Sequence, residues 1–210
     1  MSDSTLELAK QFADIVTPHI SDNLQRMSGI VGLQRFHKSK KLVGTALTIK
    51  CRPGDNLYIY KALTQLQPGQ VLVIDGAGND SNALVGELIM LYAQAHGCAG
   101  FVIDGAIRDS AAFYEADFPC YARSVVHRGP YKLGPGALNV PVSVGGQVIE
   151  SGDIIVGDED GVVSFAPSQA PALLAAIAKT QAKEEGIKQE IATGNRDQAW
   201  LNAVLQSAGI

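Results

Sequence analysis

The spacing of apolar residues changes from helical to strand-like over the first third of the chain. Residues 4–17 place apolar side chains at mostly helical spacing, and Pro18 then discourages continuation, which predicts a short opening helix. Residues 42–50 (LVGTALTIK) are rich in β-branched side chains and predict a strand. In the turn that follows, Asp55 is available to cap a helix that continues to about Leu66.

The centre of the chain has the most regular pattern. Residues 71–75 predict an apolar strand, a Gly/Asn-containing loop follows, a helix runs to about His96, and residues 100–104 predict a second apolar strand. Two continuous apolar strands joined by a helix indicate a buried parallel βαβ unit. The helical spacing predicts a shared face for Leu84, Leu88, Leu91 and Ala95. Glu87 lies off this face and is therefore free to serve a site.

Glycine-centred turns and an alanine-rich tail follow. Residues 142–149 and 153–166 each place a turn between two short apolar runs, which predicts two β-hairpins and a β layer beside the βαβ unit. From Ser168 onward the sequence is helical in character. The predicted fold class is therefore α/β, with a single domain over residues 1–210 and a helical C-terminal tail from about residue 168.

Composition limits the classes of partner. The net charge of −4 and the pI near 5.5 provide no general attraction to nucleic acid or to an anionic membrane surface. No apolar run approaches the roughly 20 residues that cross a bilayer, and the first residues lack the order of a signal peptide. The three cysteines lack CxxC spacing and are predicted to be buried, reduced thiols. We expect a cytoplasmic protein with a small-molecule or protein partner, no nucleic acid and no membrane.

Glu87, Arg108 and Asp109 form the candidate chemical site. Twenty residues separate Glu87 from the Arg-Asp pair, and both segments follow neighbouring predicted strands, at whose carboxyl ends ligands of α/β sheets bind. Helix N-terminal amides near Glu87 attract an anion, Arg108 can bind a carboxylate through two hydrogen bonds, and Asp109 can hold a hard divalent cation. An α-keto acid would use all three groups, because a cation chelated by its keto and carboxylate oxygens stabilises the enolate left by carbon–carbon cleavage.

Two alternatives remain open at this level. A Schiff base would stabilise the same carbanion, but no lysine occurs between Lys61 and Lys132, so metal catalysis is favoured unless a lysine reaches the site from elsewhere. An Asp-Gly turn followed by Arg-Asp is also compatible with a structural ion pair or a helix cap.

The segment around these residues resembles a known family. Residues 86–113 (GELIMLYAQAHGCAGFVIDGAIRDSAAF) are preceded by VLVIDGAG and followed by GPYKLGPGALNVPV and SGDIIVGDEDGVVSFAP. These motifs resemble the regulator of ribonuclease activity A family and its branch of 4-hydroxy-4-methyl-2-oxoglutarate/4-carboxy-4-hydroxy-2-oxoadipate aldolases. The resemblance covers roughly residues 21–167. It implies a swivelling β/β/α domain with a parallel βαβ core, a β layer and C-terminal helices, assembled as a homotrimer or hexamer.

The motif of the aldolase branch implies roles for individual residues. It consists of an acidic residue, usually Asp, then twenty residues, then Arg-Asp. By this resemblance Asp109 is the ligand of Mg²⁺ or Mn²⁺, and Glu87, one methylene longer than the usual Asp, takes the acid–base role. The substrate-binding set is Arg108 with the backbone amides of Glu87, Leu88 and Ile89. The family also uses an acidic residue from the C-terminal region of a neighbouring subunit, for which Glu184 is the candidate.

The resemblance implies a divalent-metal-dependent class II pyruvate aldolase. It would cleave a 4-hydroxy-2-oxo acid to pyruvate and a second oxo acid, and it would decarboxylate oxaloacetate, since loss of carbon dioxide leaves the same pyruvate enolate. The alternative is a non-enzymatic regulator that binds a ribonuclease, as the family's namesake does. A methyltransferase has little support, because the glycine-rich residues 75–78 lack a GxGxG nucleotide loop.

Overall fold

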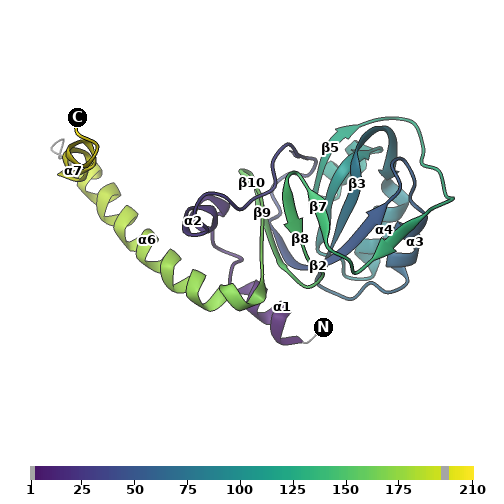
Figure 1. Ribbon diagram of the computed structural model, residues 1–210, viewed down its shortest axis with the longest axis horizontal. Helices are drawn as coiled ribbons and strands as arrows, with labels where there is room; N and C mark the ends of the chain where they lie inside the picture. The colour runs from purple at the N-terminus through teal and green to yellow at the C-terminus, as the bar shows by residue number, and fades with distance from the viewer. Residues whose placement is uncertain (1–2, 195–198) are drawn as a thin grey trace.

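A mostly parallel sheet organises the molecule (Figure 1). The computed structural model describes residues 3–194 and 199–210. Strand order is β1-β5-β4-β3-β2-β9-β10, and the short β6 pairs with β2. Strands β2, β3, β4 and β5 are mutually parallel, whereas β1, β6, β9 and β10 pair antiparallel. The bounds are β1 Gln34–Arg35, β2 Leu42–Cys51, β3 Gln70–Val85, β4 Gly100–Ile107, β5 Cys120–Val125, β6 Gly136–Leu138, β9 Ile154–Asp158 and β10 Gly161–Phe165.

The central strands separate two layers because alternate side chains point to opposite faces of a sheet. Leu72 and Ile74 pack toward the helices α3 (Leu57–Leu63), α4 (Glu87–Ala95) and α5 (Ser110–Glu115). Val71 and Val73 pack instead toward the hairpin of β7 (Val142–Val144) and β8 (Gln147–Ile149). Both faces are buried, which explains the continuous apolar run of the strand. The arrangement confirms the predicted β/β/α order of layers around a parallel βαβ core.

Strand β3 is longer than predicted. The expected Gly/Asn loop after Asp75 is a continuation of the strand to Val85, with shifts of register against β4 between Asp75 and Val85. Ala77 and Gly78 have φ of +55° and +67°, which marks an irregular, bulged stretch. Because β3 resumes its pairing with β4, Val85 lies beside Ile107, and the segments that follow these two residues leave the sheet side by side.

The predicted buried face of α4 was wrong. Ile89, Met90 and Ala93 are the buried residues, whereas Leu88 is 78% exposed and Leu91 is 48% exposed. The prediction counted the helical period from Leu84, but this residue belongs to β3 and the helix begins only at Glu87. The phase of the period was therefore set by a residue outside the helix.

The opening segment contains two helices where one was predicted. They are α1 (Asp3–Lys10) and α2 (Thr17–Asn23). Pro18 lies in the first turn of α2, where a helix needs no intrahelical N–H donor, so this proline begins a helix.

Both predicted hairpins are present, but they lie in different sheets. The pair β7–β8 forms the separate β layer. The pair β9–β10 instead extends the central sheet, because β9 pairs antiparallel with β2. The outer face of this extension is covered by α1, α2 and the start of α6 (Ala170–Ala192), through buried residues that include Phe12, Ile20 and Leu173.

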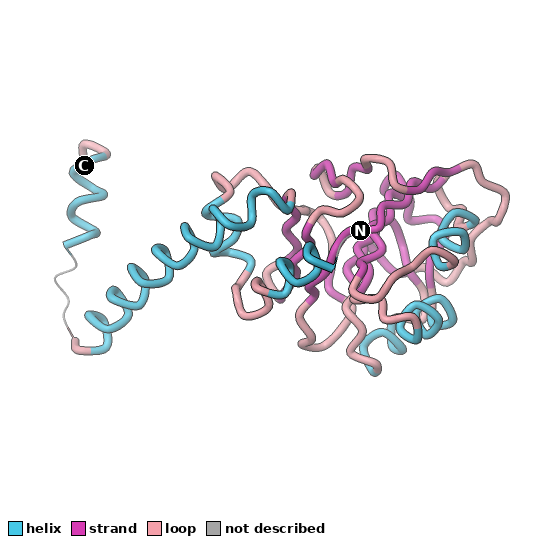
Figure 2. Tube along the Cα trace, turned by 90° about the horizontal axis from the view of Figure 1, so that it is seen from below, coloured by secondary structure: helices cyan, strands magenta, loops and turns pink. Residues whose placement is uncertain are grey.

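The C-terminal helices extend from one end of the body (Figures 1 and 2). Leu173 and Ile177 of α6 are buried, whereas the later turns of α6 and all of α7 (Ala199–Ser207) lack buried residues. Among the described residues no helix combines the length and apolar character needed to span a membrane.

The three cysteines are buried and unbridged, as predicted. Burial raises the pKa of the Cys51 thiol to about 12 and that of the Cys98 thiol to about 11.

Candidate active site

The ends of β3 and β4 bring the predicted residues together. The N–H of Arg108 donates to the carbonyl of Val85 (3.0 Å), so Gly86-Glu87 and Arg108-Asp109 leave the sheet side by side. This is the carboxyl edge of neighbouring parallel strands, where ligands of α/β sheets bind. The backbone of Glu87 therefore lies next to the Arg108-Asp109 pair.

Asp109 links the two segments. Its Oδ2 accepts the backbone N–H of Glu87 at 3.0 Å and lies 3.6 Å from Nε of Arg108. The backbone of Asp109 has φ of +55°, a left-handed conformation that Asp tolerates better than most residues. Such conformations concentrate at functional sites, where surrounding contacts hold them. The side chain remains 44% exposed, so its carboxylate is accessible to a ligand.

Gly86 permits this close approach. A Cβ at position 86 would lie 2.4 Å from Oδ2 of Asp109 and 3.0 Å from Cγ of Arg108. Real Cβ atoms do not occupy such positions, so only glycine leaves both side chains in place. The sequence analysis did not identify this residue; its signal was a glycine directly before the helix that carries Glu87.

The first turn of α4 presents backbone donors to the site. Its first intrahelical hydrogen bond joins the N–H of Met90 to the carbonyl of Gly86 (3.1 Å). The N–H groups of Leu88 and Ile89 precede it and have no partner within the helix. The N–H of Glu87 is already engaged by Asp109. Of the three amides predicted to cradle a carboxylate, those of Leu88 and Ile89 therefore have no backbone partner in the part of the chain that the structure describes.

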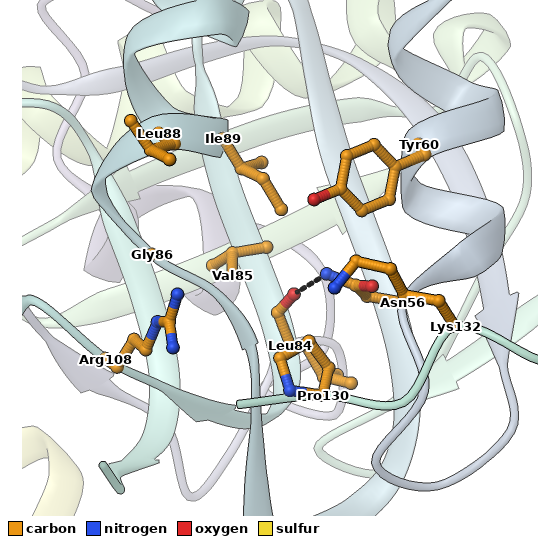
Figure 3. A pocket seen from close by; sticks show the side chains of 10 residues that line it. All are labelled: Asn56, Tyr60, Leu84, Val85, Gly86, Leu88, Ile89, Arg108, Pro130 and Lys132. Carbon is orange, nitrogen blue, oxygen red and sulfur yellow. Dashed lines mark hydrogen bonds between the residues drawn. The ribbon is translucent and has the colours of Figure 1, made fainter. Parts of the chain in front are cut away.

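A small cavity of about 60 Å³ lies against this turn (Figure 3). Arg108 flanks one side, while Asn56, Tyr60 and Lys132 face it from the other. The remaining lining residues are Leu84, Val85, Gly86, Leu88, Ile89 and Pro130. The cavity thus joins the predicted arginine to the free helix amides, and the carboxylates of Glu87 and Asp109 lie outside its lining.

Asn56 adds an unsatisfied acceptor. The residue is 2% exposed, and its Nδ2 donates to the carbonyl of Leu84 at 3.0 Å, which orients the amide. Its Oδ1 is buried and has no hydrogen-bond partner in the described part of the chain. Leaving a buried acceptor unsatisfied costs about 1–3 kcal/mol, so a donor on a bound ligand would relieve this. In the sequence, a turn with a helix cap explains Asp55-Asn56 as well as substrate contact does, so Asn56 was not among the predicted site residues.

Asp55 fixes the segment that carries Pro130 and Lys132. Its Oδ2 accepts the N–H groups of Leu133 (2.6 Å) and Gly134 (3.0 Å), and its Oδ1 accepts that of Leu57 (2.9 Å). Burial opposes ionisation, but these backbone N–H groups and the nearby Arg52 outweigh it and hold the pKa of Asp55 below its ordinary value. The predicted cap is displaced by one residue, because Asn56 occupies the N-cap position of α3; Asp55 precedes it and accepts the N–H of Leu57, the first residue of the helix.

We predict that Asp55→Asn lowers the free energy of unfolding at pH 7 by about 1–3 kcal/mol, because one acceptor becomes an amide donor facing N–H groups. A lowered folded-state pKa contributes stability above the ordinary Asp pKa of about 3.9, and this contribution is lost as pH falls through the folded value. The difference in free energy of unfolding between wild type and variant, measured with urea, should therefore be smaller at pH 3 than at pH 7. An equal gap at both pH values would contradict a role for the ionised carboxylate; Asp14→Asn, at an exposed position, is the control.

The residues present fit one type of cation site. No group of three or more His, Cys, Asp or Glu side chains suited to holding a metal exists among the described residues. Mg²⁺ and related hard cations are, however, often held by one or two carboxylates with waters and substrate oxygens. Asp109 fits this type, since its Oδ2 accepts the N–H of Glu87 while its side chain remains 44% exposed.

Comparison with known proteins places the chain in a family. A family model described as RraA-like, Aldolase/RraA, matches residues 17–164. The chain belongs to the RraA-like family. A Halalkalibacterium halodurans protein is 37% identical over 192 residues, which are 91% of each chain, and its name gives a provisional assignment as a 4-hydroxy-4-methyl-2-oxoglutarate aldolase.

Solved structures of similar RraA-like fold carry different names. One from Streptomyces coelicolor is described as RraAS2, an unusual member of the RNase ES inhibitor RraA protein family; its TM-score is 0.78 at 25% identity, with 88% of this chain and 98% of that chain covered. Another, from Geobacillus kaustophilus, is described as an S-adenosylmethionine:2-dimethylmenaquinone methyltransferase; its TM-score is 0.67 at 30% identity, with 72% and 95% covered. A shared RraA-like fold therefore does not define a single function, and the residues of the site decide it.

Two further residues named in the sequence analysis have defined positions in the structure. Lys132, which was treated as the far limit of a lysine-free stretch, lines the cavity itself. Glu184, the candidate for a neighbouring site, has Oε2 2.8 Å from Nε2 of His19 in its own chain. The hydrogen bond from His19 lowers the pKa of Glu184.

Proposed function

We propose that this protein is a divalent-metal-dependent class II pyruvate aldolase. It cleaves a 4-hydroxy-2-oxo acid to pyruvate and a second oxo acid, and it decarboxylates oxaloacetate. One observation carries the proposal: Arg108 and the first turn of α4 line a single cavity, and the carboxylate of Asp109 lies just outside it, 3.6 Å from Nε of Arg108. The name of the 37% identical relative supports the same substrate class.

The residues of the cavity suit a 2-oxo carboxylate. The N–H groups of Leu88 and Ile89, at the positive end of α4, stabilise its carboxylate, and the guanidinium of Arg108 binds its oxygens in the plane of the 2-oxo acid. Arg108 is 45% exposed, and its Nε lies 3.6 Å from Oδ2 of Asp109, so the guanidinium is accessible to substrate beside the carboxylate. These contacts position the bond to be broken.

The remaining groups hold the cation and move protons. Asp109 would hold the divalent cation, which supplies Lewis-acid stabilisation of the charge that develops on the 2-oxo oxygen. Glu87, exposed at the rim beside Asp109, is the group we assign to proton transfer. Oδ1 of Asn56 accepts a hydrogen bond from the 4-hydroxyl group of the substrate, or from a water molecule to which that hydroxyl group gives its proton.

A regulator that binds a ribonuclease is the second candidate. It is favoured by apolar side chains on the outer face of α4, where Leu88, Leu91 and Tyr92 are 78%, 48% and 46% exposed. If binding to purified ribonuclease fragments is absent in calorimetry, this candidate is removed.

We propose that the same face is instead buried between copies of the chain in a homotrimer or hexamer. The mass of the assembly can be measured by light scattering. Three buried, unbridged thiols suit a reducing, cytoplasmic setting.

The deciding experiment is pyruvate release by purified protein. Oxaloacetate and 4-hydroxy-4-methyl-2-oxoglutarate would each be supplied with Mg²⁺, with Mn²⁺ and with chelator. We expect turnover with either cation and its loss with chelator, because the charge on the departing enolate then lacks its main stabilisation. Absence of turnover for both substrates by folded, cation-supplied protein would reject the aldolase proposal and favour the regulator.

A further inference from the structure

Lys132 places a second cation at the substrate cavity. Figure 3 shows its ammonium group reaching toward the centre from the side opposite Arg108. Nζ lies 5.7 Å from the centroid of the Tyr60 ring, an orientation that a cation–π interaction favours. No ion pair of Lys132 with an acidic side chain is present in residues 3–194 and 199–210. The charge is therefore available to a ligand.

The backbone around Lys132 is fixed. The N–H of Tyr131 donates to the carbonyl of Gly54 (2.8 Å), and the carbonyl of Tyr131 accepts the N–H of Asn56 (3.0 Å). On the other side, the N–H of Leu133 is held by the buried carboxylate of Asp55. Both neighbours of Lys132 are thus anchored to the start of α3, and only its side chain is free to adjust. A cation presented in this way is positioned for recognition and is more than a solvated surface charge.

Two cations across one small cavity match a dicarboxylate. Arg108 and the amides of α4 take one carboxylate, and a second anionic group at the far end of the ligand would meet Lys132. A ligand with only one carboxylate would leave the ammonium facing an apolar chain end. The arrangement therefore distinguishes substrates by their distal half, which the Arg-Asp pair does not touch.

We propose that Lys132 binds the distal carboxylate of the substrate and makes the protein selective for dicarboxylic 2-oxo acids. The inference rests on the proposed function and names the residue that selects within that substrate class. Lys132 is exposed and is assigned no covalent step. A Schiff base at the same lysine is the competing role, and the experiment below separates the two.

Binding tests the proposal without turnover. The probes are 2-oxoglutarate and 2-oxopentanoate, which have the same chain length and differ in the distal carboxylate. With Mg²⁺ present, we expect the wild type to bind 2-oxoglutarate about 10- to 100-fold more tightly in calorimetry, the range for one charge-assisted hydrogen bond. Lys132→Met should lose this preference, and Lys132→Arg should keep most of it. Lys61→Met is the matched control, since Lys61 lies 5.4 Å from the ring of Tyr58 and does not line the cavity.

Turnover separates the remaining outcomes. For Lys132→Met we expect a raised KM for 4-hydroxy-4-methyl-2-oxoglutarate and little change for the monocarboxylic 4-hydroxy-2-oxopentanoate. Loss of both activities in Lys132→Met and Lys132→Arg, with borohydride trapping of pyruvate on the wild type, would overturn the proposal in favour of a Schiff base. An unchanged preference in Lys132→Met would also overturn it while leaving the aldolase function intact. A wild type that turns over no substrate and shows no preference in binding would reject both.

Discussion

Replacing Asp109 with asparagine is expected to lower kcat for pyruvate release by at least about 10³-fold, since the stabilisation that a divalent cation supplies is several kcal/mol. Asparagine keeps an oxygen that accepts the N–H of Glu87, and it tolerates the φ of +55° found at this position. It removes the negative charge that attracts the cation. The fold should therefore be retained while the site loses its ligand.

Cation binding provides a readout independent of turnover. Mn²⁺ titration followed by calorimetry should show tight binding to the wild type and at least tenfold weaker binding to Asp109→Asn, because this carboxylate is the protein ligand that we assign. Asp14→Ala removes an exposed carboxylate elsewhere and should leave both binding and turnover unchanged. Equal Mn²⁺ affinity in wild type and Asp109→Asn would show that Asp109 is no ligand.

Gly86→Ala is expected to reduce turnover by about 10²-fold or more, since displacing a catalytic group by about 1 Å can have an effect of this size. The added methyl would lie 2.4 Å from Oδ2 of Asp109, so this carboxylate or the β3–α4 connection must move. The backbone of Gly86 has φ of −152°, which alanine adopts without strain, so the effect would come from the contact alone.

A second glycine offers a matched control. Gly186 lies within α6, and a Cβ there meets no atom within 4 Å. Gly186→Ala should stabilise the helix by about 0.5–1 kcal/mol and leave turnover unchanged. If Gly86→Ala has wild-type kinetics and an unchanged melting temperature, then the approach of Asp109 to this glycine is not required for activity.

Local pattern in the sequence predicted the elements whose burial is regular. The strands at residues 71–75 and 100–104 were identified because both faces are covered, and residues 71–74 and 101–103 are therefore all apolar. The glycine-centred turns of both hairpins were identified because their backbone conformation demands those residues. The Arg108-Asp109 pair was found from its place directly after a predicted strand, from its spacing of twenty residues from Glu87, and from the resemblance of the surrounding motif.

Other features depend on which segments meet in space. The residues of α4 that are buried depend on which elements pack against the helix, and the position of β9–β10 depends on the pairing of β9 with β2. Local periodicity does not reveal either of these contacts. Asn56 and Lys132 come from segments far apart in sequence, and they face one cavity only because Asp55 ties the second segment to the first.

By itself, the sequence determined the alternation of strands and helices, the layers of the core and the Arg-Asp pair at the carboxyl edge of the sheet. These features follow from interactions between residues close along the chain and from the side on which each residue is buried. The tertiary structure decided which N–H groups at the start of α4 face the cavity, why residue 86 must be glycine, and that Lys132 lines the same cavity as Arg108. Such features require atoms from distant segments to come within a few ångströms of each other, and only the folded chain fixes those distances.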